Sequence, residues 1–118
     1  MSILEDLNKD LKELDIYIEV ASLSVKAPDS YIILTPIYDD YEIFADNLPL
    51  RSIESVRISL FSKGNYLALK KRLESLLLKK DYTVSSRKYI NFEPDTKYYH
   101  YAIDVEKDYE VEEWLWQQ

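Results

Sequence analysis

Residues able to do catalytic chemistry are few in this sequence and form no known pattern. His100 is the only histidine and cysteine is absent, so thiolate ligands, disulfides and cysteine nucleophiles are excluded. No serine-containing nucleophile motif accompanies His100, so we expect a cross-strand polar role rather than a Ser–His triad. The sequence therefore predicts no catalytic residue and no enzyme activity.

Two further segments could in principle bind an ion or a phosphate. Asp39, Asp40, Glu42 and Asp46 lie close together, but they lack the alternating ligands and central glycine of an EF-hand. A solvated acidic loop is the favoured interpretation. Gly64 is the only glycine, and one glycine cannot build a phosphate-cradling loop. We predict neither a metal site nor a cofactor.

Charge is distributed unevenly along the chain. The formal net charge is −7, yet residues 63–88 contain eight basic and two acidic residues, a local balance of +6. The remaining residues carry 20 acidic against seven basic side chains, a balance of −13. A basic helix on an acidic body gives a two-signed surface on which copies can associate, although a solvated helix flank explains the pattern equally simply.

Eleven tyrosines raise the alternative of nucleic-acid binding, because tyrosines on a sheet can stack on bases. The acidic balance and the absence of an RNP-like motif argue against it, since the expected footprint is a basic face. Aromatic packing between strands accounts for the tyrosines without a nucleic acid. We therefore expect nucleic-acid binding to be weak or absent.

Length and composition predict one domain over residues 1–118, with 47% hydrophobic residues to supply its core. The N-terminal sequence MSILEDLNKD is acidic and amphipathic, unlike a signal peptide. No apolar run approaches the ~18 residues of a membrane helix. We therefore expect a protein made in a cytoplasm that does not bind membranes.

The strongest local pattern runs from Glu54 to Lys80. Period-2 alternation predicts a strand that ends at Phe61, after which Gly64 is expected to need a positive φ or a close backbone approach. Asn65 is a good N-cap for a helix over residues 66–80. Its apolar stripe consists of Tyr66, Leu69, Leu73, Leu76 and Leu77.

The rest of the chain supplies a second helix and further strands. Ser2 and Glu5 have capping-box spacing at the start of the first helix. In chain order, we predict a helix over 2–14, strands over 16–25 and 31–37, an irregular segment over 38–53, a strand over 54–61, a helix over 66–80, and strands over 82–92 and 98–105. This order predicts an α+β fold, with a mainly antiparallel sheet of about five strands and two helices packed on one face.

Several apolar residues fall outside the predicted core stripes. Leu67 and Leu78 lie on a charged flank of the helix over 66–80, about 20° apart at 100° per residue. The apolar residues of 38–53 and the C-terminal tryptophans either pack on the core or contact a partner. The candidate contact residues are Leu67, Lys71, Glu74 and Leu78 on the helix, Asp39, Asp40, Phe44, Leu48 and Leu50 in the irregular segment, and Trp114 and Trp116 near the C-terminus.

Three segments carry a resemblance to a known family: APDSYIILTPI, the acidic FADNLPL region, and VRISLFSKGNYLALKKRLESLL. Together with the later EPDTKYYHYAIDVEKDYE, they resemble the tail-completion or tail-terminator proteins of long-tailed phages and prophages, also called tail-to-head joining proteins. The resemblance spans roughly residues 1–110 and excludes the WLWQQ ending. It consists of strand and turn patterns, so no functional residue transfers.

The resemblance implies an α+β fold, no catalysis, and a ring, usually hexameric, at the head-proximal end of the tail tube. Its implied partners are other copies of the chain, the tail-tube protein and a head-closure or connector protein, with nucleic acid only as DNA that passes through the ring. The implied location is the host cytoplasm during assembly and then the virion tail. Two alternatives stay open: another head–tail connector or minor tail protein, and a small nucleic-acid-binding or regulatory module.

Overall fold

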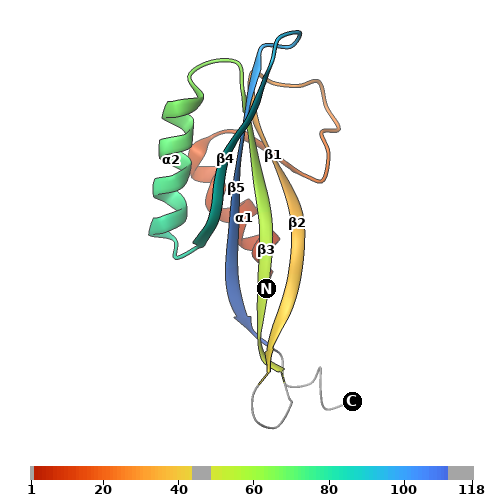
Figure 1. The fold of residues 1–118 in the computed structure, drawn as a ribbon, viewed down its shortest axis with the longest axis vertical. Helices are drawn as coiled ribbons and strands as arrows, with labels where there is room; N and C mark the ends of the chain where they lie inside the picture. Colours follow the sequence, from red (N-terminus) through yellow and green to blue (C-terminus); the bar gives the residue numbers. More distant parts are fainter. Residues whose placement is uncertain (1, 44–48, 112–118) are drawn as a thin grey trace.

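The computed structural model describes residues 2–43 and 49–111 (Figure 1). Two α-helices, a 3-10 helix and five strands follow one another along the chain. Their bounds are α1 (Ile3–Asp10), η1 (Leu11–Leu14), β1 (Tyr17–Val20), β2 (Ser30–Ile43), β3 (Pro49–Ser62), α2 (Tyr66–Lys79), β4 (Thr83–Glu93) and β5 (Tyr98–Glu110).

The five strands form one mixed sheet in the order β1-β2-β3-β5-β4. Neighbouring strands are antiparallel except β1 and β2, which run parallel. The parallel pair arises because residues 21–29 return the chain to the end of the sheet at which β1 began. The α+β class, the five strands and the two helices are confirmed, whereas the mainly antiparallel sheet requires this correction.

One side of the sheet and the helices share a single hydrophobic core. Its fully buried members include Leu7 of α1, Leu73 and Leu77 of α2, Ile58 of β3 and Ile103 of β5. The two helices are not equivalent in their packing. α1 contacts mainly β3, whereas α2 contacts β3, the edge strand β4 and η1; Figure 1 shows α1 behind the strands and α2 beside β4.

Both predicted helix N-caps are confirmed. The Glu5 amide donates to Ser2 Oγ at 3.2 Å, and the Ala68 amide donates to Asn65 Oδ1 at 3.3 Å. The expectation for Gly64 was wrong, because its φ is not positive and a Cβ there would meet no atom within 4 Å. Asp15 and Asp81 instead adopt the left-handed conformation, directly after η1 and after the last turn of α2.

The prediction of an irregular segment over 38–53 was also wrong for residues 38–43 and 49–53, the part that the structure describes. β2 continues to Ile43 and β3 begins at Pro49, so the two strands form a long antiparallel pair. β5 likewise continues past its predicted end at Val105 and pairs with β3 as far as Arg51–Glu110. We call residues 38–43, 49–54 and 106–110 the arm. The molecule is elongated, with extents of 54 × 26 × 24 Å.

Hydrogen bonds fix α1 to two tyrosines, Tyr109 of β5 and Tyr82, which directly precedes β4. Tyr82 Oη donates to Asp10 at 2.9 Å, and Tyr109 Oη donates to Asp6 at 2.5 Å. Burial, followed by the hydrogen bond to the carboxylate, raises the pKa of each tyrosine well above its usual range. Near the N-terminus of α1, the Ile3 amide donates to Glu54 of the arm at 2.8 Å.

Candidate functional site

The outer flank of α2 carries four of the predicted contact residues. The helix turns its stripe of Leu73 and Leu77 into the core, which leaves Leu67 51% exposed and Leu78 64% exposed. Lys71 is also exposed. The helical periodicity therefore predicted these exposures correctly, while the role of this flank as a contact stays a prediction.

Glu74, the fourth member of that flank, already has a partner within the chain. Its Oε2 accepts from Arg87 Nη1 of β4 at 2.9 Å, and its side chain is only 18% exposed. Its Oε1 is buried without a hydrogen-bond partner among the described residues. Glu74 thus connects α2 to the edge strand, and it is less accessible to a second molecule than Lys71.

A hollow lies beside this flank, between η1 and α2. It has a volume of about 380 Å³ and is lined by Glu13, Leu14, Lys71, Arg72, Ser75 and Leu76. Arg72 holds the two elements together by donating from Nη2 to the carbonyl oxygen of Leu14 at 3.3 Å. We call this hollow the η1–α2 groove. Its mixture of leucines and cations suits an acidic segment with a large apolar side chain.

The second predicted surface, the acidic segment, lies in the arm. Asp39 and Asp40 are exposed on β2, where they pair with Glu54 and Ile53 of β3. They therefore lie in a strand rather than in the expected loop. Leu50 lies in β3, but its side chain is not among those described; Phe44, Leu48, Trp114 and Trp116 lie outside the described residues.

The arm is acidic and is held by polar contacts. Its described residues include seven acidic and two basic side chains. Arg51 Nε donates to Asp108 at 2.6 Å, which lowers the pKa of that carboxyl. Tyr38 Oη donates to Glu106 at 3.0 Å, which raises the pKa of the tyrosine. Both contacts are exposed to solvent, which screens them, so each contributes little to stability.

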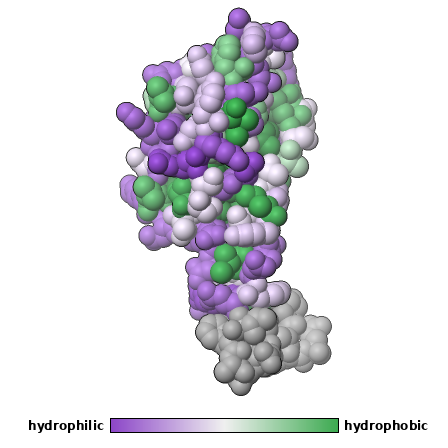
Figure 2. Space-filling model, viewed as in Figure 1, coloured by the Kyte–Doolittle hydropathy of each residue, from purple (hydrophilic) through white to green (hydrophobic). Residues whose placement is uncertain are grey.

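The sheet face opposite the helices carries an aromatic row that the sequence analysis missed. The Tyr31 and Phe61 rings stack at 4.8 Å, and Phe61 stacks on His100 at 4.2 Å. Tyr98 lies edge-on to Tyr31 and to Phe61. Tyr31, Phe61 and His100 occupy matching positions on three neighbouring strands. Figure 2, viewed from the side opposite α1, shows hydrophobic and hydrophilic residues intermixed.

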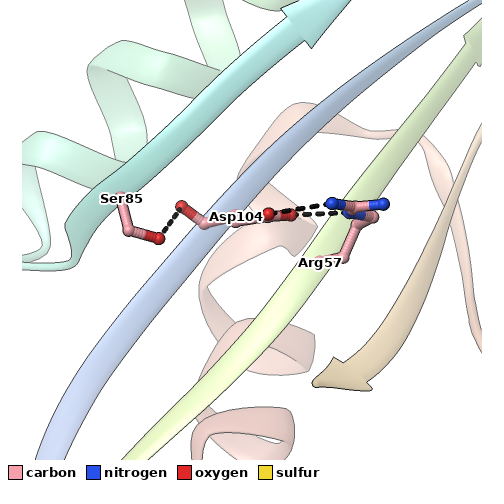
Figure 3. Close-up of polar contacts among 3 residues, drawn as sticks. All are labelled: Arg57, Ser85 and Asp104. Carbon is pink, nitrogen blue, oxygen red and sulfur yellow. Dashed lines mark hydrogen bonds and ion pairs between the residues drawn. The ribbon is translucent and has the colours of Figure 1, made fainter. Parts of the chain in front are cut away.

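An ion pair on the same face joins β3 to β5 (Figure 3). Arg57 binds Asp104 through two hydrogen bonds, from Nε at 2.7 Å and from Nη2 at 3.0 Å. Ser85 Oγ donates to the Asp104 carbonyl oxygen at 3.2 Å and so ties β4 to the pair. The Asp104 carboxylate raises the pKa of Arg57. This bidentate pairing leaves Arg57 poorly placed to bind a phosphate.

The single histidine lies within the aromatic row. Burial lowers the pKa of His100, and its Nε2 has no hydrogen-bond partner in the described part of the chain. Within residues 2–43 and 49–111, no three histidine or carboxylate side chains are grouped to hold a metal ion. His100 is thus a neutral aromatic neighbour of Phe61 at neutral pH.

Neither a scan of protein-family models nor a search of curated proteins finds a match to this chain. In the described ranges, no helix has the length and apolar character needed to cross a bilayer.

Proposed function

We propose that this protein is a structural virion protein of a tailed phage or prophage, which forms a ring that terminates the tail tube and joins it to the head connector. The observation that carries the proposal is a pair of oppositely charged surfaces on different elements. One is the acidic arm with Asp39 and Asp40; the other is the exposed flank of α2 with Lys71. A closed ring requires such a heterologous contact, in which one surface meets a different surface of the next copy.

The shape and the sequence resemblance support the same proposal. The arm projects from an elongated molecule, so its exposed residues are placed to reach a neighbouring copy (Figure 1). The described parts of the segments that resemble tail-completion proteins lie in β2, β3, α2, the β4–β5 turn and β5. A hexamer is the ring size that the resemblance implies.

Reconstitution with tail tubes tests this function directly. The purified protein would be added to tubes assembled from the tail-tube protein encoded near its gene. We expect electron micrographs to show a ring at one tube end and tubes that then bind the head connector. Binding to the connector alone would instead identify another head–tail connector protein. A gene with no head or tail genes around it, and tubes left bare, would contradict the proposal.

The aromatic row on the open sheet face favours nucleic-acid binding as a second candidate. Three stacked rings across neighbouring strands resemble a platform on which bases could stack. The nearest arginine, Arg57, is already paired with Asp104, and the chain as a whole is acidic. Lys63 lies beside the row, with its Nζ 5.1 Å from the centre of the Tyr98 ring. A single lysine on an acidic chain is expected to give weak, salt-sensitive binding of single strands.

A further inference from the structure

The η1–α2 groove combines an apolar floor with a cationic rim. Leu14 and Leu76 provide the apolar surface, and both belong to or pack against the hydrophobic core. Lys71 and Arg72 are exposed at the edge, opposed by a single carboxylate, that of Glu13. The volume of about 380 Å³ falls within the range of pockets that hold small ligands, ~300–1,000 Å³. The groove therefore suits one large apolar side chain next to acidic residues.

The segment that follows the arm in the sequence has that chemistry. Residues 112–118 read EEWLWQQ, with two glutamates directly before Trp114 and Trp116. Tryptophan is enriched among the residues that dominate binding energy at interfaces. The glutamates would face the cations of the rim while an indole ring covers the leucines.

The sheet register places the groove of the same chain far from Val111, the last described residue before the segment. Arg87 pairs with Ile103 of β5 and also binds Glu74, so this part of α2 lies level with Ile103. Val111 lies eight residues further along, about 26 Å at ~3.3 Å per residue. Trp114 and Trp116 follow Val111 by three and five residues, at most ~11 and ~18 Å of chain. The groove lies in the helix layer, which lengthens the path further.

We propose that residues 112–118 of one copy bind the η1–α2 groove of a second copy. Glu112 and Glu113 pair with Lys71 and Arg72, and an indole ring packs on Leu14 and Leu76. The inference rests on the proposed self-assembly and adds one specific contact to it. Because the segment and the groove are different surfaces, the contact is heterologous, as ring closure requires.

The two tryptophans are the only ones in the chain, so their fluorescence reports on this segment alone. On concentrating the full-length protein, we expect the emission to shift to shorter wavelength as the indoles leave water. The shift should reverse in high salt, which screens the ion pairs. Lys71→Glu should move the midpoint of the shift to about tenfold higher concentration, since it replaces an attraction with a repulsion. Lys88→Glu makes the same charge change on β4, outside the groove, and should leave the midpoint unchanged.

A mixing experiment distinguishes binding between copies from binding within one copy. The Lys71→Glu chain keeps its tryptophans but has a weakened groove. A chain with Trp114→Ala and Trp116→Ala keeps the groove and emits no tryptophan fluorescence. Adding the second chain to the first should restore the shift to shorter wavelength. Circular dichroism of each variant checks that its fold is retained.

Three results would overturn the inference: a shift independent of protein concentration, equal effects of Lys71→Glu and Lys88→Glu, or no restoration on mixing. The proposed function is judged separately, by rings on tail tubes. If the fluorescence behaves as expected while the tubes stay bare, the contact stands and the tail function fails. If the tubes are capped but the emission never shifts, the tail function stands and the contact fails.

Discussion

The double substitution Lys71→Glu with Leu78→Asp should block ring formation while leaving the fold intact. Both side chains are exposed on α2, and Leu78 keeps 64% of its surface in water. Surface substitutions of this kind usually change the free energy of unfolding by less than ~0.5 kcal/mol. The fold is therefore expected to survive, and any loss of function can be assigned to contacts between copies.

The expected size of the effect follows from the exposure of Leu78. Burying a whole leucine side chain is worth ~1.5–3 kcal/mol, so covering the exposed part contributes about 1–2 kcal/mol to each contact. Reversing the charge of Lys71 adds about 1 kcal/mol. Each contact should thus weaken by roughly 2–3 kcal/mol, about 30- to 150-fold in its equilibrium constant. A ring repeats the contact at every subunit, so the losses multiply.

Sedimentation and tail completion should be measured together, because the free protein can stay monomeric until it meets the tail tube. Lys88→Glu with Ile90→Asp is the matched control: it makes the same kinds of change on exposed residues of β4. We expect the control to complete tails and the α2 variant to fail. Normal tail yield from the α2 variant would show that this flank is not the interface.

Three further predictions concern stability and nucleic acid. Leu73→Ala should destabilise the monomer by ~2–5 kcal/mol in denaturant unfolding, because Leu73 is 0% exposed in the core. Leu67→Ala on the same helix should change the free energy of unfolding by under ~0.5 kcal/mol. Equal effects of Leu73→Ala and Leu67→Ala would mean that the helix faces are misassigned. The raised pKa of Tyr82 keeps it neutral in the folded state, so its contribution to stability is present below pH ~10 and is lost as the pH rises further. Tyr82→Phe should reduce the loss of unfolding free energy above pH ~10 by up to ~1.4 kcal/mol per pH unit. An unchanged dependence of stability on pH would show that Tyr82 does not cause this loss. Labelled single-stranded DNA at ~0.15 M salt should bind weakly, whereas submicromolar affinity that falls steeply with salt would favour the aromatic row as a nucleic-acid site.

The elements that were predicted correctly are those whose conformation depends on residues close to one another in the sequence. The stripe of α2 follows from helical periodicity, and its buried residues Leu73 and Leu77 are the ones expected. In β5, the alternation that places Tyr101, Ile103 and Val105 on one face is confirmed by their burial in the core. The caps at Ser2 and Asn65 are likewise local, because each depends on an amide three residues away.

The arm could not be predicted in this way, because long-range pairing decides its conformation. Asp39, Asp40 and Tyr41 are all exposed, so the side chains of this stretch do not alternate between buried and exposed. The sequence accordingly shows no period-2 alternation of apolar and polar residues there. Aspartate is disfavoured in strands, and the segment therefore reads as a loop. The same limitation explains the missed parallel pairing of β1, which depends on where residues 21–29 lead the chain.

The contacts on the open sheet face depend on register between distant segments. Arg57 and Asp104 are 47 residues apart, and nothing near either residue indicates that they pair. Tyr31, Phe61 and His100 form a row only once β2, β3 and β5 are aligned. By contrast, the exposed position of Leu67 and Leu78 needed only the geometry of one helix. Sequence patterns thus located the outer flank of α2, which is the candidate contact surface, but not the side-chain contacts that join the strands on the open sheet face.

The distribution of buried residues leaves several large side chains of the arm outside the core. The fully buried leucines and isoleucines lie in α1, η1, α2 and the strand segments that the helices cover, and Val56 and Val105 are the fully buried residues nearest the arm. Within the arm, Tyr109 packs against this core and is partly buried. Beyond them, Tyr38 and Tyr41 stay exposed, and Tyr41 keeps 59% of its surface in water. A hairpin that buries so little gains little stability from its own packing. A second copy that covers Tyr38 and Tyr41 would add apolar burial that the monomer lacks there, and this burial is how a partner would stabilise the arm.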